Sequence, residues 1–172
     1  MNKIKKKVAV LGEAGVGKTT LIQMYCSQGQ SFSRDYHMTQ VCDIASKIIQ
    51  IDDEVDVELF FFDVSGRDLY REPVSSLVRE SDYVIMVYDL TRKSSVSSLS
   101  TWMDILKKSN NNRSLPGILI GTKQDLSVLR EVSPENVKEM ASNFEMESFE
   151  LSCENFEQVE QAINTLARKA AE

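Results

Sequence analysis

Residues 12–19 set the architecture of this chain, and they read Gly12-Glu13-Ala14-Gly15-Val16-Gly17-Lys18-Thr19. The spacing matches the phosphate-binding P-loop, in which backbone N–H groups and the start of a helix surround phosphate oxygens. Glycines are needed because side chains would block the phosphate, while Lys18 neutralises the β- and γ-phosphates and Thr19 offers a hydroxyl to Mg²⁺. We expect these residues to contact a bound nucleotide: Glu13, Ala14, Gly15, Val16, Gly17, Lys18, Thr19 and Thr20.

The segments on either side of this motif have the composition that a P-loop needs. The apolar run Val8-Ala9-Val10-Leu11 precedes it and predicts a strand over residues 7–11. Leu21 and Tyr25 follow at helical spacing and predict a helix over residues 17–27. The competing interpretation is a glycine-rich turn with a chance lysine, and the strand–loop–helix placement argues against it.

The rest of the chain alternates short runs rich in Val, Ile and Phe with helix-length segments, which is typical of a mostly parallel sheet. Further strands are predicted at residues 42–51, 55–64, 83–89, 117–121 and 148–151. Residues 52–54 form so short a link that the two strands beside it must pair antiparallel. The predicted fold class is α/β, with one domain over residues 1–172, a six-stranded mostly parallel sheet, one antiparallel edge hairpin and about five helices.

Two segments carry helical patterns whose ordinary meaning is structural. The last helix repeats apolar residues at helical spacing, which predicts packing on the sheet: Phe156, Val159, Ile163, Leu166 and Ala170. Residues 94–100 are rich in serine, but Trp102 and Leu106 follow in a helical register. We therefore expect a capped helix start there and not a disordered segment.

Composition indicates the size of the core and argues against nucleic acid as a partner. The chain has 172 residues, of which 42% are hydrophobic and 27% charged, so it can bury the core of a single domain. Its formal net charge is -6. Nucleic acid is therefore not an expected partner, because such binding depends on Lys and Arg neutralising phosphates. The basic run Lys3, Lys5, Lys6 and Lys7 is interpreted as a solvated strand entrance, with contact to anionic lipid as the alternative.

The cysteines and the chain ends favour a cytoplasmic protein without a lipid anchor. Cys26, Cys42 and Cys153 have no short paired spacing, and no secretory leader is present, so free thiols are expected. Residue 2 is Asn2 and not the glycine that myristoylation requires, and the last five residues lack a prenylatable cysteine. No direct lipid anchor is predicted.

A candidate metal-side carboxylate lies at the end of a second apolar run. Asp63-Val64-Ser65-Gly66 follows Leu59-Phe60-Phe61-Phe62, where a P-loop protein needs an acid on the Mg²⁺ side. Taken alone, an aspartate leaving a buried strand often only caps its own turn. Together with the P-loop, Asp63 is predicted to hold Mg²⁺ through water, beside Thr19.

Two further motifs point to the base of the nucleotide. Thr122-Lys123-Gln124-Asp125 follows the apolar strand at 118–120, and a carboxylate there can accept from both N1–H and the exocyclic amine of guanine. Adenine offers no such pair of donors, so the wrong base would leave Asp125 unpaired at about 1–3 kcal/mol. Ser152-Cys153-Glu154 follows the last strand, where a backbone N–H can meet the guanine O6, although a plain strand-to-helix cap explains it equally well.

These motifs resemble the Ras superfamily of small GTPases in their order and spacing, and the resemblance covers essentially the whole chain. Val87-Tyr88-Asp89-Leu90-Thr91 is similar to the fourth-strand motif of Rab-type members. The resemblance implies a three-layer Ras-like G domain of the P-loop NTPase class that binds GTP or GDP with Mg²⁺ and hydrolyses GTP.

The resemblance also implies roles for residues that lie in predicted loops. Tyr36-His37-Met38-Thr39 corresponds to switch I, with Tyr36 beside the nucleotide and Thr39 as the second Mg²⁺ hydroxyl and sensor of the γ-phosphate. Gly66 corresponds to the switch II amide that meets the γ-phosphate. Phe32 falls where the family packs an aromatic ring against guanine. Without the resemblance, Phe32 and Tyr36 would be interpreted as surface residues or a local apolar contact.

Within the superfamily, the residues of two strands resemble the Rab-like small GTPases that are subunits of the intraflagellar transport B complex. They are Val57-Glu58-Leu59-Phe60-Phe61-Phe62-Asp63 and Ser114-Leu115-Pro116-Gly117-Ile118-Leu119-Ile120-Gly121. This resemblance implies a heterodimer with a small β-sandwich subunit, within a larger complex, and a place in the cilium or flagellum. A divergent Rab of membrane traffic is the alternative.

The chain departs from the family pattern at three positions. Active members carry a glutamine directly after the switch II glycine to orient the attacking water, and Arg67 stands there instead. Ala14 stands where many members have glycine, and its methyl group crowds the transition state. Both changes predict slow GTP hydrolysis, and Thr122 in place of asparagine predicts looser nucleotide binding. An ion pair of Arg67 with Asp68 or Glu72 is a compatible structural role.

Three functions remain open at the level of sequence. The first is a nucleotide-dependent switch in which the γ-phosphate orders Thr39 and Gly66. The second is a structural subunit whose bound nucleotide only stabilises the fold, which Arg67 and Ala14 favour. A small-molecule kinase, the third, conflicts with the guanine motif and with the lack of an acceptor site.

Overall fold

The computed structural model describes residues 2–30, 39–67 and 71–172. The elements in chain order are β1 (Asn2–Leu11), α1 (Lys18–Cys26), β2 (Cys42–Gln50), β3 (Val55–Val64), α2 (Arg71–Leu77), β4 (Tyr83–Asp89), α3 (Lys93–Ser97), α4 (Leu99–Ser109), β5 (Gly117–Thr122), η2 (Gln124–Leu129), α5 (Pro134–Phe144), β6 (Glu147–Glu150) and α6 (Phe156–Ala171). Six of them are α-helices and η2 is a 3₁₀ helix, so the predicted number of about five helices is one short for the described residues.

The strands form one sheet in the order β2-β3-β1-β4-β5-β6. β2 and β3 pair antiparallel, and the other neighbours pair parallel. The predicted α/β class and the edge hairpin are therefore confirmed. This strand order brings the carboxyl ends of β1, β4 and β5 to one edge of the sheet, where α/β proteins bind their ligands.

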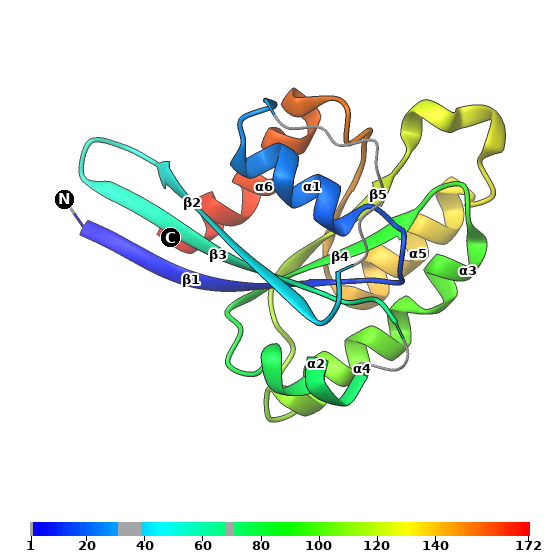
Figure 1. Ribbon diagram of the computed structural model, residues 1–172, viewed down its shortest axis with the longest axis horizontal. Coiled ribbons are helices and arrows are strands. Elements are labelled where there is room, and N and C mark those ends of the chain that lie inside the picture. The colour runs from blue at the N-terminus through cyan, green and yellow to red at the C-terminus, as the bar shows by residue number, and fades with distance from the viewer. Residues whose placement is uncertain (1, 31–38, 68–70) are drawn as a thin grey trace.

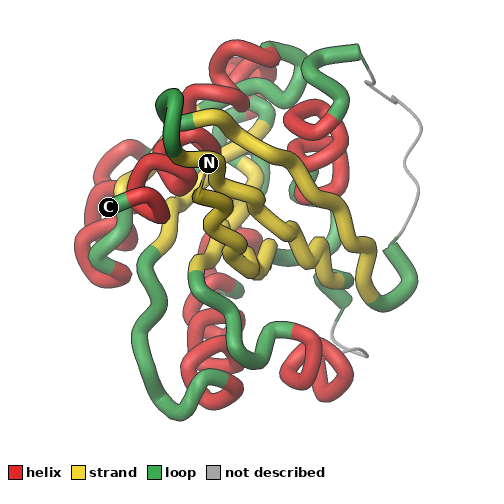
Figure 2. Tube along the Cα trace, turned by 90° about the vertical axis from the view of Figure 1, so that its left-hand side faces the viewer, coloured by secondary structure: helices red, strands yellow, loops and turns green. Residues whose placement is uncertain are grey.

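Helices cover both faces of the sheet, which gives the three predicted layers (Figures 1 and 2). α1 and α6 pack on one face, where Tyr25, Phe61 and Ile163 belong to one buried cluster. α2, α4 and α5 pack on the other, where Trp102 and Leu106 lie in a second cluster. In α6 the predicted stripe faces the sheet: Val159, Ile163 and Leu166 are fully buried, Ala170 is buried, and Phe156 packs against the cluster.

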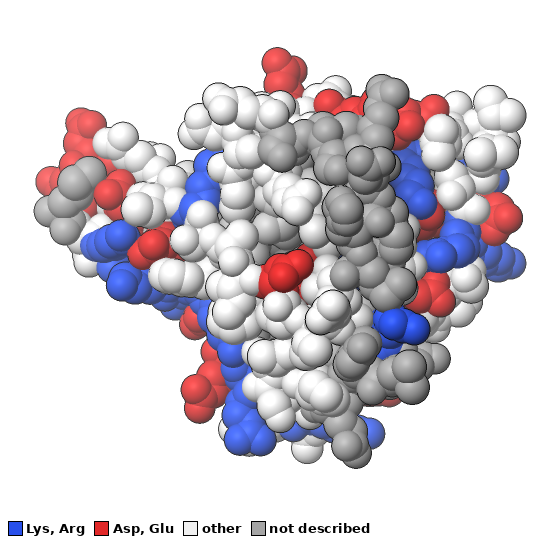
Figure 3. Space-filling model, viewed as in Figure 1, with Lys and Arg blue, Asp and Glu red and all other residues white. Residues whose placement is uncertain are grey.

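The basic residues near the start belong to β1, which begins five residues before the predicted position. The strand extends backwards because β3 pairs with it from Asn2, opposite Val55. Lys3 forms an ion pair with Glu58 at 3.1 Å and Lys6 with Asp82 at 3.6 Å. On the arm formed by β1, β2 and β3, positive and negative side chains lie side by side (Figure 3). These contacts support the interpretation of a solvated strand.

The serine-rich segment is helical, as predicted, but the predicted side-chain cap is absent at both of its helix starts. α3 begins after Arg92 and α4 after Ser98, and neither residue caps its helix with a side-chain hydrogen bond. Ser95 is fully buried instead, and its hydroxyl donates to the Arg92 carbonyl at 2.6 Å and accepts from the Asp89 N–H at 3.0 Å. Ser95 therefore holds the turn between β4 and α3.

Two smaller expectations concern thiols and membranes. Cys26, Cys42 and Cys153 are free, as predicted. Across the described ranges, no helix combines the length and the apolar character that crossing a bilayer requires.

Candidate functional site

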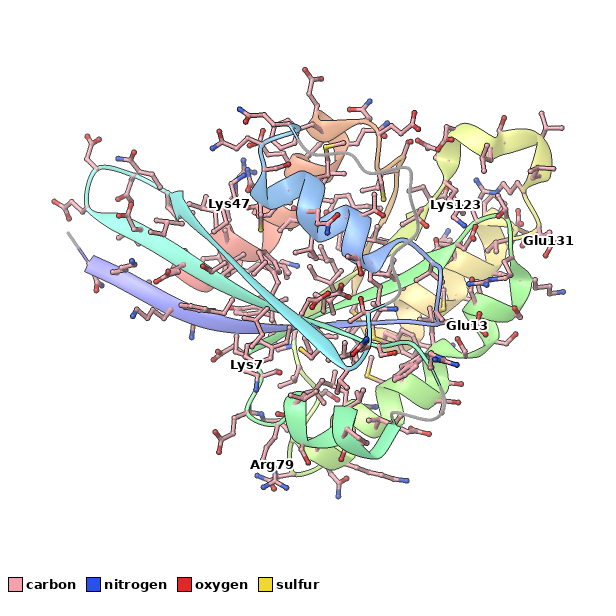
Figure 4. The ribbon with its side chains drawn as sticks, in the orientation of Figure 1. Lys7, Glu13, Lys47, Arg79, Lys123 and Glu131 are labelled. Carbon is pink, nitrogen blue, oxygen red and sulfur yellow. The ribbon has the colours of Figure 1, made fainter. Side chains whose placement is uncertain are left out.

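The P-loop lies directly after β1, at the edge of the sheet where β5 also ends. Figure 4 shows Glu13 beyond the end of β1 and Lys123 beyond the end of β5, on the same side of the molecule. Gly12, Gly15 and Gly17 all have positive φ, at 151°, 75° and 100°. A Cβ at Gly12 would lie 2.2 Å from the Val87 carbonyl oxygen of β4, so this position admits only glycine.

The P-loop carbonyl groups accept hydrogen bonds from side chains of three elements. Lys18 Nζ donates to the carbonyls of Gly12 and Glu13 at 3.0 Å each. Lys123 Nζ donates to the Gly15 carbonyl at 3.3 Å, and the Thr122 hydroxyl donates to the Val16 carbonyl at 2.6 Å. Because the N–H and C=O of a trans peptide point in opposite directions, the carbonyls held by Lys123 and Thr122 leave the Val16 and Gly17 N–H groups free to face a phosphate.

Lys18 is the buried cation of this site, with a relative exposure of 6%. Burial lowers its pKa to about 8, although the nearby Asp63 carboxylate opposes that shift. A buried cation beside backbone N–H groups creates a strong positive potential in a small volume. This arrangement fits the multiply charged tail of a nucleoside triphosphate.

Three oxygen-bearing side chains meet where Mg²⁺ was predicted. The Thr19 hydroxyl donates to Asp63 Oδ2 and lies 3.0 Å from the Thr39 hydroxyl oxygen. Asp63 is 3% exposed, and its other oxygen, Oδ1, is buried without a hydrogen-bond partner. Burial raises the pKa of Asp63, and the Thr19 hydroxyl opposes the shift. Two hydroxyls and a carboxylate whose buried Oδ1 is unsatisfied fit a hydrated Mg²⁺, which would satisfy Oδ1.

Gly66, the predicted switch II glycine, lies against the P-loop. A Cβ at Gly66 would lie 2.3 Å from the Ala14 nitrogen and 2.4 Å from the Gly12 carbonyl oxygen. This position therefore needs glycine because the P-loop backbone passes so close. Arg67 follows at once and is partly buried.

The base motifs converge on the same loop from β5 and β6. Thr122 is fully buried, and its side chain and Cys153 Sγ both lie within 3.7 Å of where a Gly17 Cβ would be. Burial raises the pKa of Cys153 to about 12, so its thiol stays neutral. Asp125 is exposed within η2, and Glu154 is exposed with its N–H on the Ser152 hydroxyl at 3.3 Å.

The structure thus brings most of the predicted site residues together. Thr20 lies partly buried in the first turn of α1, behind Lys18 and Thr19. Phe32, Tyr36 and His37 lie outside the described residues, as does Asp68, one of the ion-pair partners considered for Arg67. The side chain of Glu72, the other partner considered, is not described either.

Asp89, the last residue of β4, and Arg92, in the turn after it, contact the loops of the site and were missed from sequence. Asp89 is 2% exposed, and its carboxylate accepts from Lys123 Nζ at 2.6 Å. Burial opposes ionisation, but hydrogen bonds from Lys123 and Thr91 outweigh it and hold the pKa of Asp89 below its usual range. Arg92 Nη2 donates to the Ala14 carbonyl at 2.8 Å. Two charged residues at the end of a predicted buried strand were the sequence feature that could have pointed to them.

The comparisons with known proteins agree with this geometry. The model of the Ras family matches residues 7–172. The chain is 33% identical over 170 residues to the intraflagellar transport protein 27 homolog of Mus musculus, covering 98% of this chain and 91% of that protein. Identity to intraflagellar transport protein 27 of Chlamydomonas reinhardtii is 35% over 153 residues, or 87% and 75% of the two chains.

Rab proteins match the chain as well. Ras-related protein Rab-7b of Mus musculus is 34% identical over 170 residues, covering 98% of this chain and 83% of that protein. The predicted resemblance to the Ras superfamily and to its Rab-like and intraflagellar transport members is therefore confirmed. The chain belongs to the Ras family of small GTPases.

Proposed function

We propose that this chain is a guanine-nucleotide-binding, Rab-like small GTPase with weak intrinsic GTP hydrolysis, and that it acts as a subunit of an intraflagellar transport B complex. The observation that carries the nucleotide-binding part is the meeting of three sets of groups at one sheet edge. They are the P-loop with Lys18, the oxygen cluster of Thr19, Thr39 and Asp63, and the base loops after β5 and β6.

Each end of the nucleotide has its own residues in this proposal. The P-loop N–H groups and Lys18 bind the phosphates, and Thr39 and Gly66 sense the terminal one. Mg²⁺, held by Thr19, Thr39 and the water shell of Asp63, would neutralise charge on the β- and γ-phosphates when bound. Asp125 accepts from guanine, and Lys123 ties that loop to the P-loop through the Gly15 carbonyl.

Nucleotide titration tests this part directly. We expect fluorescent GDP and GTP to bind in the presence of Mg²⁺, and labelled ATP to bind far more weakly. Replacing Asp125 by Ala should reduce the preference for guanine over adenine, while replacing the exposed Asp104 should leave it unchanged. Equal affinities for the guanine and adenine nucleotides in the unaltered protein would refute the proposal.

Slow hydrolysis is proposed from Arg67 and Ala14. A guanidinium has no lone pair to accept a proton from water, so Arg67 cannot replace a water-orienting glutamine. Ala14 adds a methyl group to the segment of the P-loop that touches Gly66. Single-turnover hydrolysis well below that of a Rab carrying the glutamine is the expected result.

The transport assignment rests on the relatives that bear that name. A ciliary location and a heterodimer with a small β-sandwich subunit belong to this proposal. Apolar side chains exposed on the described surface are compatible with protein partners: Ile44 and Ile48 on β2, and Leu126, Val128 and Leu129 on η2. Capture from native ciliated cells should recover transport-complex subunits, whereas recovery of membrane-traffic effectors would favour a divergent Rab.

The structural-subunit alternative is separated from the switch by partner affinity. A switch binds its partner differently with a GTP analogue and with GDP, because the γ-phosphate orders Thr39 and Gly66. A scaffold binds equally in both states. Calorimetry with the purified transport subunit and each nucleotide state distinguishes the two.

A further inference from the structure

We propose that Arg92 is a positioning residue for the terminal phosphate of GTP, which acts by fixing the Ala14–Gly15 peptide of the P-loop. Its guanidinium Nη2 donates to the Ala14 carbonyl at 2.8 Å and lies 3.5 Å from Glu13 Oε2. Arg92 comes from the turn between β4 and α3, 78 residues beyond Ala14. The proposal rests on the nucleotide-binding function proposed above.

The contact between Arg92 and the Ala14 carbonyl matters because the Ala14–Gly15 peptide can rotate. Gly15 has a φ of 75°, and a Cβ placed there would meet nothing within 4 Å, so local packing does not restrain it. Glycine occupies positive and negative φ about equally well, which permits rotation of the preceding peptide plane. Since the Ala14 carbonyl and the Gly15 N–H point in opposite directions, the bond from Arg92 turns that N–H toward the phosphate side.

Arg92 completes a pattern in which five successive carbonyls of the P-loop accept from side chains. Lys18 holds the first two, at Gly12 and Glu13, and Lys123 and Thr122 hold the last two, at Gly15 and Val16. Arg92 holds the one between them, at Ala14. Without Arg92, the peptide that precedes Gly15 would have no side-chain donor.

The backbone of Arg92 is itself held in place. Its N–H donates to the Asp89 carbonyl at 3.0 Å, and its carbonyl accepts from the Ser95 hydroxyl at 2.6 Å and the Ser95 N–H at 3.1 Å. Ser95 is fully buried. Because the backbone is already fixed, only the side chain of Arg92 loses entropy when it holds the P-loop.

The position of the contact indicates the γ-phosphate side. Gly66, the switch II glycine, lies against Ala14 and Glu13, the same two residues that Arg92 touches. Arg92 also neutralises Glu13, whose carboxylate would otherwise repel a polyphosphate. Removing Arg92 should therefore weaken the hold on GTP more than the hold on GDP.

The test is the rate at which labelled GDP and a labelled non-hydrolysable GTP analogue leave the protein in Mg²⁺. Replacing Arg92 by Ala should speed release of the GTP analogue about tenfold, as expected for one lost hydrogen bond to a charged group, and release of GDP by about threefold or less. R92K keeps a donor and should recover part of the GTP effect. K93A removes the neighbouring exposed charge and should match the unaltered protein.

Unchanged release from R92A, or equal acceleration of both nucleotides, would overturn the proposal. The E13Q/R92A double variant separates the hydrogen bond from the neutralised charge. Release of the GTP analogue should stay faster than from the unaltered protein, and complete restoration by E13Q would also overturn the proposal. Should R92A fold poorly in urea titrations, R92M serves as the second variant, because methionine keeps much of the side-chain length and has no N–H donor, and the same selective loss of GTP is expected. Failure of the unaltered protein to bind any guanine nucleotide would instead reject the proposed function.

Discussion

Arg67 stands where the resemblance to the Ras superfamily predicts a water-orienting glutamine. It follows Gly66, which lies against the P-loop, so its side chain starts close to where the γ-phosphate would sit. We predict that R67Q raises the single-turnover rate of GTP hydrolysis by about tenfold, because glutamine can orient the attacking water. The rate is measured from bound GTP after rapid mixing with Mg²⁺.

R67K is the matched control, because it keeps the positive charge and supplies no group that orients water. It should remain as slow as the unaltered protein. If R67Q is equally slow, the missing glutamine is not the main defect, and A14G becomes the next variant to measure. A hydrolysis rate that rises in A14G but not in R67Q would assign the slow reaction to the methyl group of Ala14.

Asp89 is the second residue with a measurable role. Its folded pKa lies below the ordinary value, so its ionised form stabilises the fold at pH values above its unfolded pKa of about 3.9. D89N should therefore lower the free energy of unfolding by about 1–3 kcal/mol at pH 7. As the pH falls through the folded pKa, the unaltered protein loses the same stabilisation, and the difference between the two proteins should shrink.

Urea titrations of nucleotide-free protein at several pH values measure this difference. D104N is the control, since Asp104 is exposed on α4, and it should change stability little at any pH. A difference for D89N that stayed constant into strong acid would show that the pair with Lys123 is not its cause.

At the scale of elements, the sequence predicted most strands well because their hydrophobic runs are continuous. The predicted bounds of β3 and β4 agree with the structure, β5 differs by one residue at its end, and β6 is shifted by one residue at both ends. β1 was predicted too short because residues 2–7 are rich in lysine. Its extension depends on pairing with β3, which lies far along the chain. α2 was not predicted, since its residues Arg71–Leu77 have little apolar periodicity.

The residues of the candidate site were also predicted only in part. Lys18, Thr19 and Asp63 were predicted from local motifs, and the structure brings them together. Asp89 and Arg92 were missed because their partners, Lys123 and Ala14, are 34 and 78 residues away along the chain. Only the packing of the β4–α3 turn against the P-loop gives these two residues a role at the site.

The cap of α6 gives a prediction at this scale. Asn155 begins the helix, and its side-chain oxygen accepts from the Gln158 N–H at 3.2 Å. N155A should lower the free energy of unfolding by about 1 kcal/mol, because that N–H loses its partner at the helix end. N155D retains an acceptor at the positive end of the helix dipole and should stay close to the unaltered protein.

Chemical denaturation measures both variants without nucleotide. T165A is the matched control in the same helix. Thr165 is half-buried and its hydroxyl donates to the Gln161 carbonyl within the helix, and alanine has the higher helix propensity, so little loss is expected. If N155A were as stable as T165A, the cap would contribute nothing, and the position of the Ser152-Cys153-Glu154 loop would depend on other contacts.

At the scale of the molecule, the nucleotide site joins segments that are far apart in sequence. The P-loop touches the ends of β4, β5 and β6, through Val87, Thr122 and Cys153. A ligand that fills this junction therefore stabilises contacts among much of the sheet edge and both helical layers. Any molecule that binds only the folded chain raises its stability by mass action.

We predict that GDP with Mg²⁺, at a thousand times its dissociation constant, raises the free energy of unfolding by about 4 kcal/mol, and that ADP at the same concentration does not. K18A should lose most of this increase, because Lys18 is the buried cation of the site. K108A, at an exposed position of α4, should keep it. Each variant is compared with and without nucleotide, so that any change in its intrinsic stability cancels. An equal increase with ADP, or a full increase in K18A, would mean that the ligand binds elsewhere than at the P-loop.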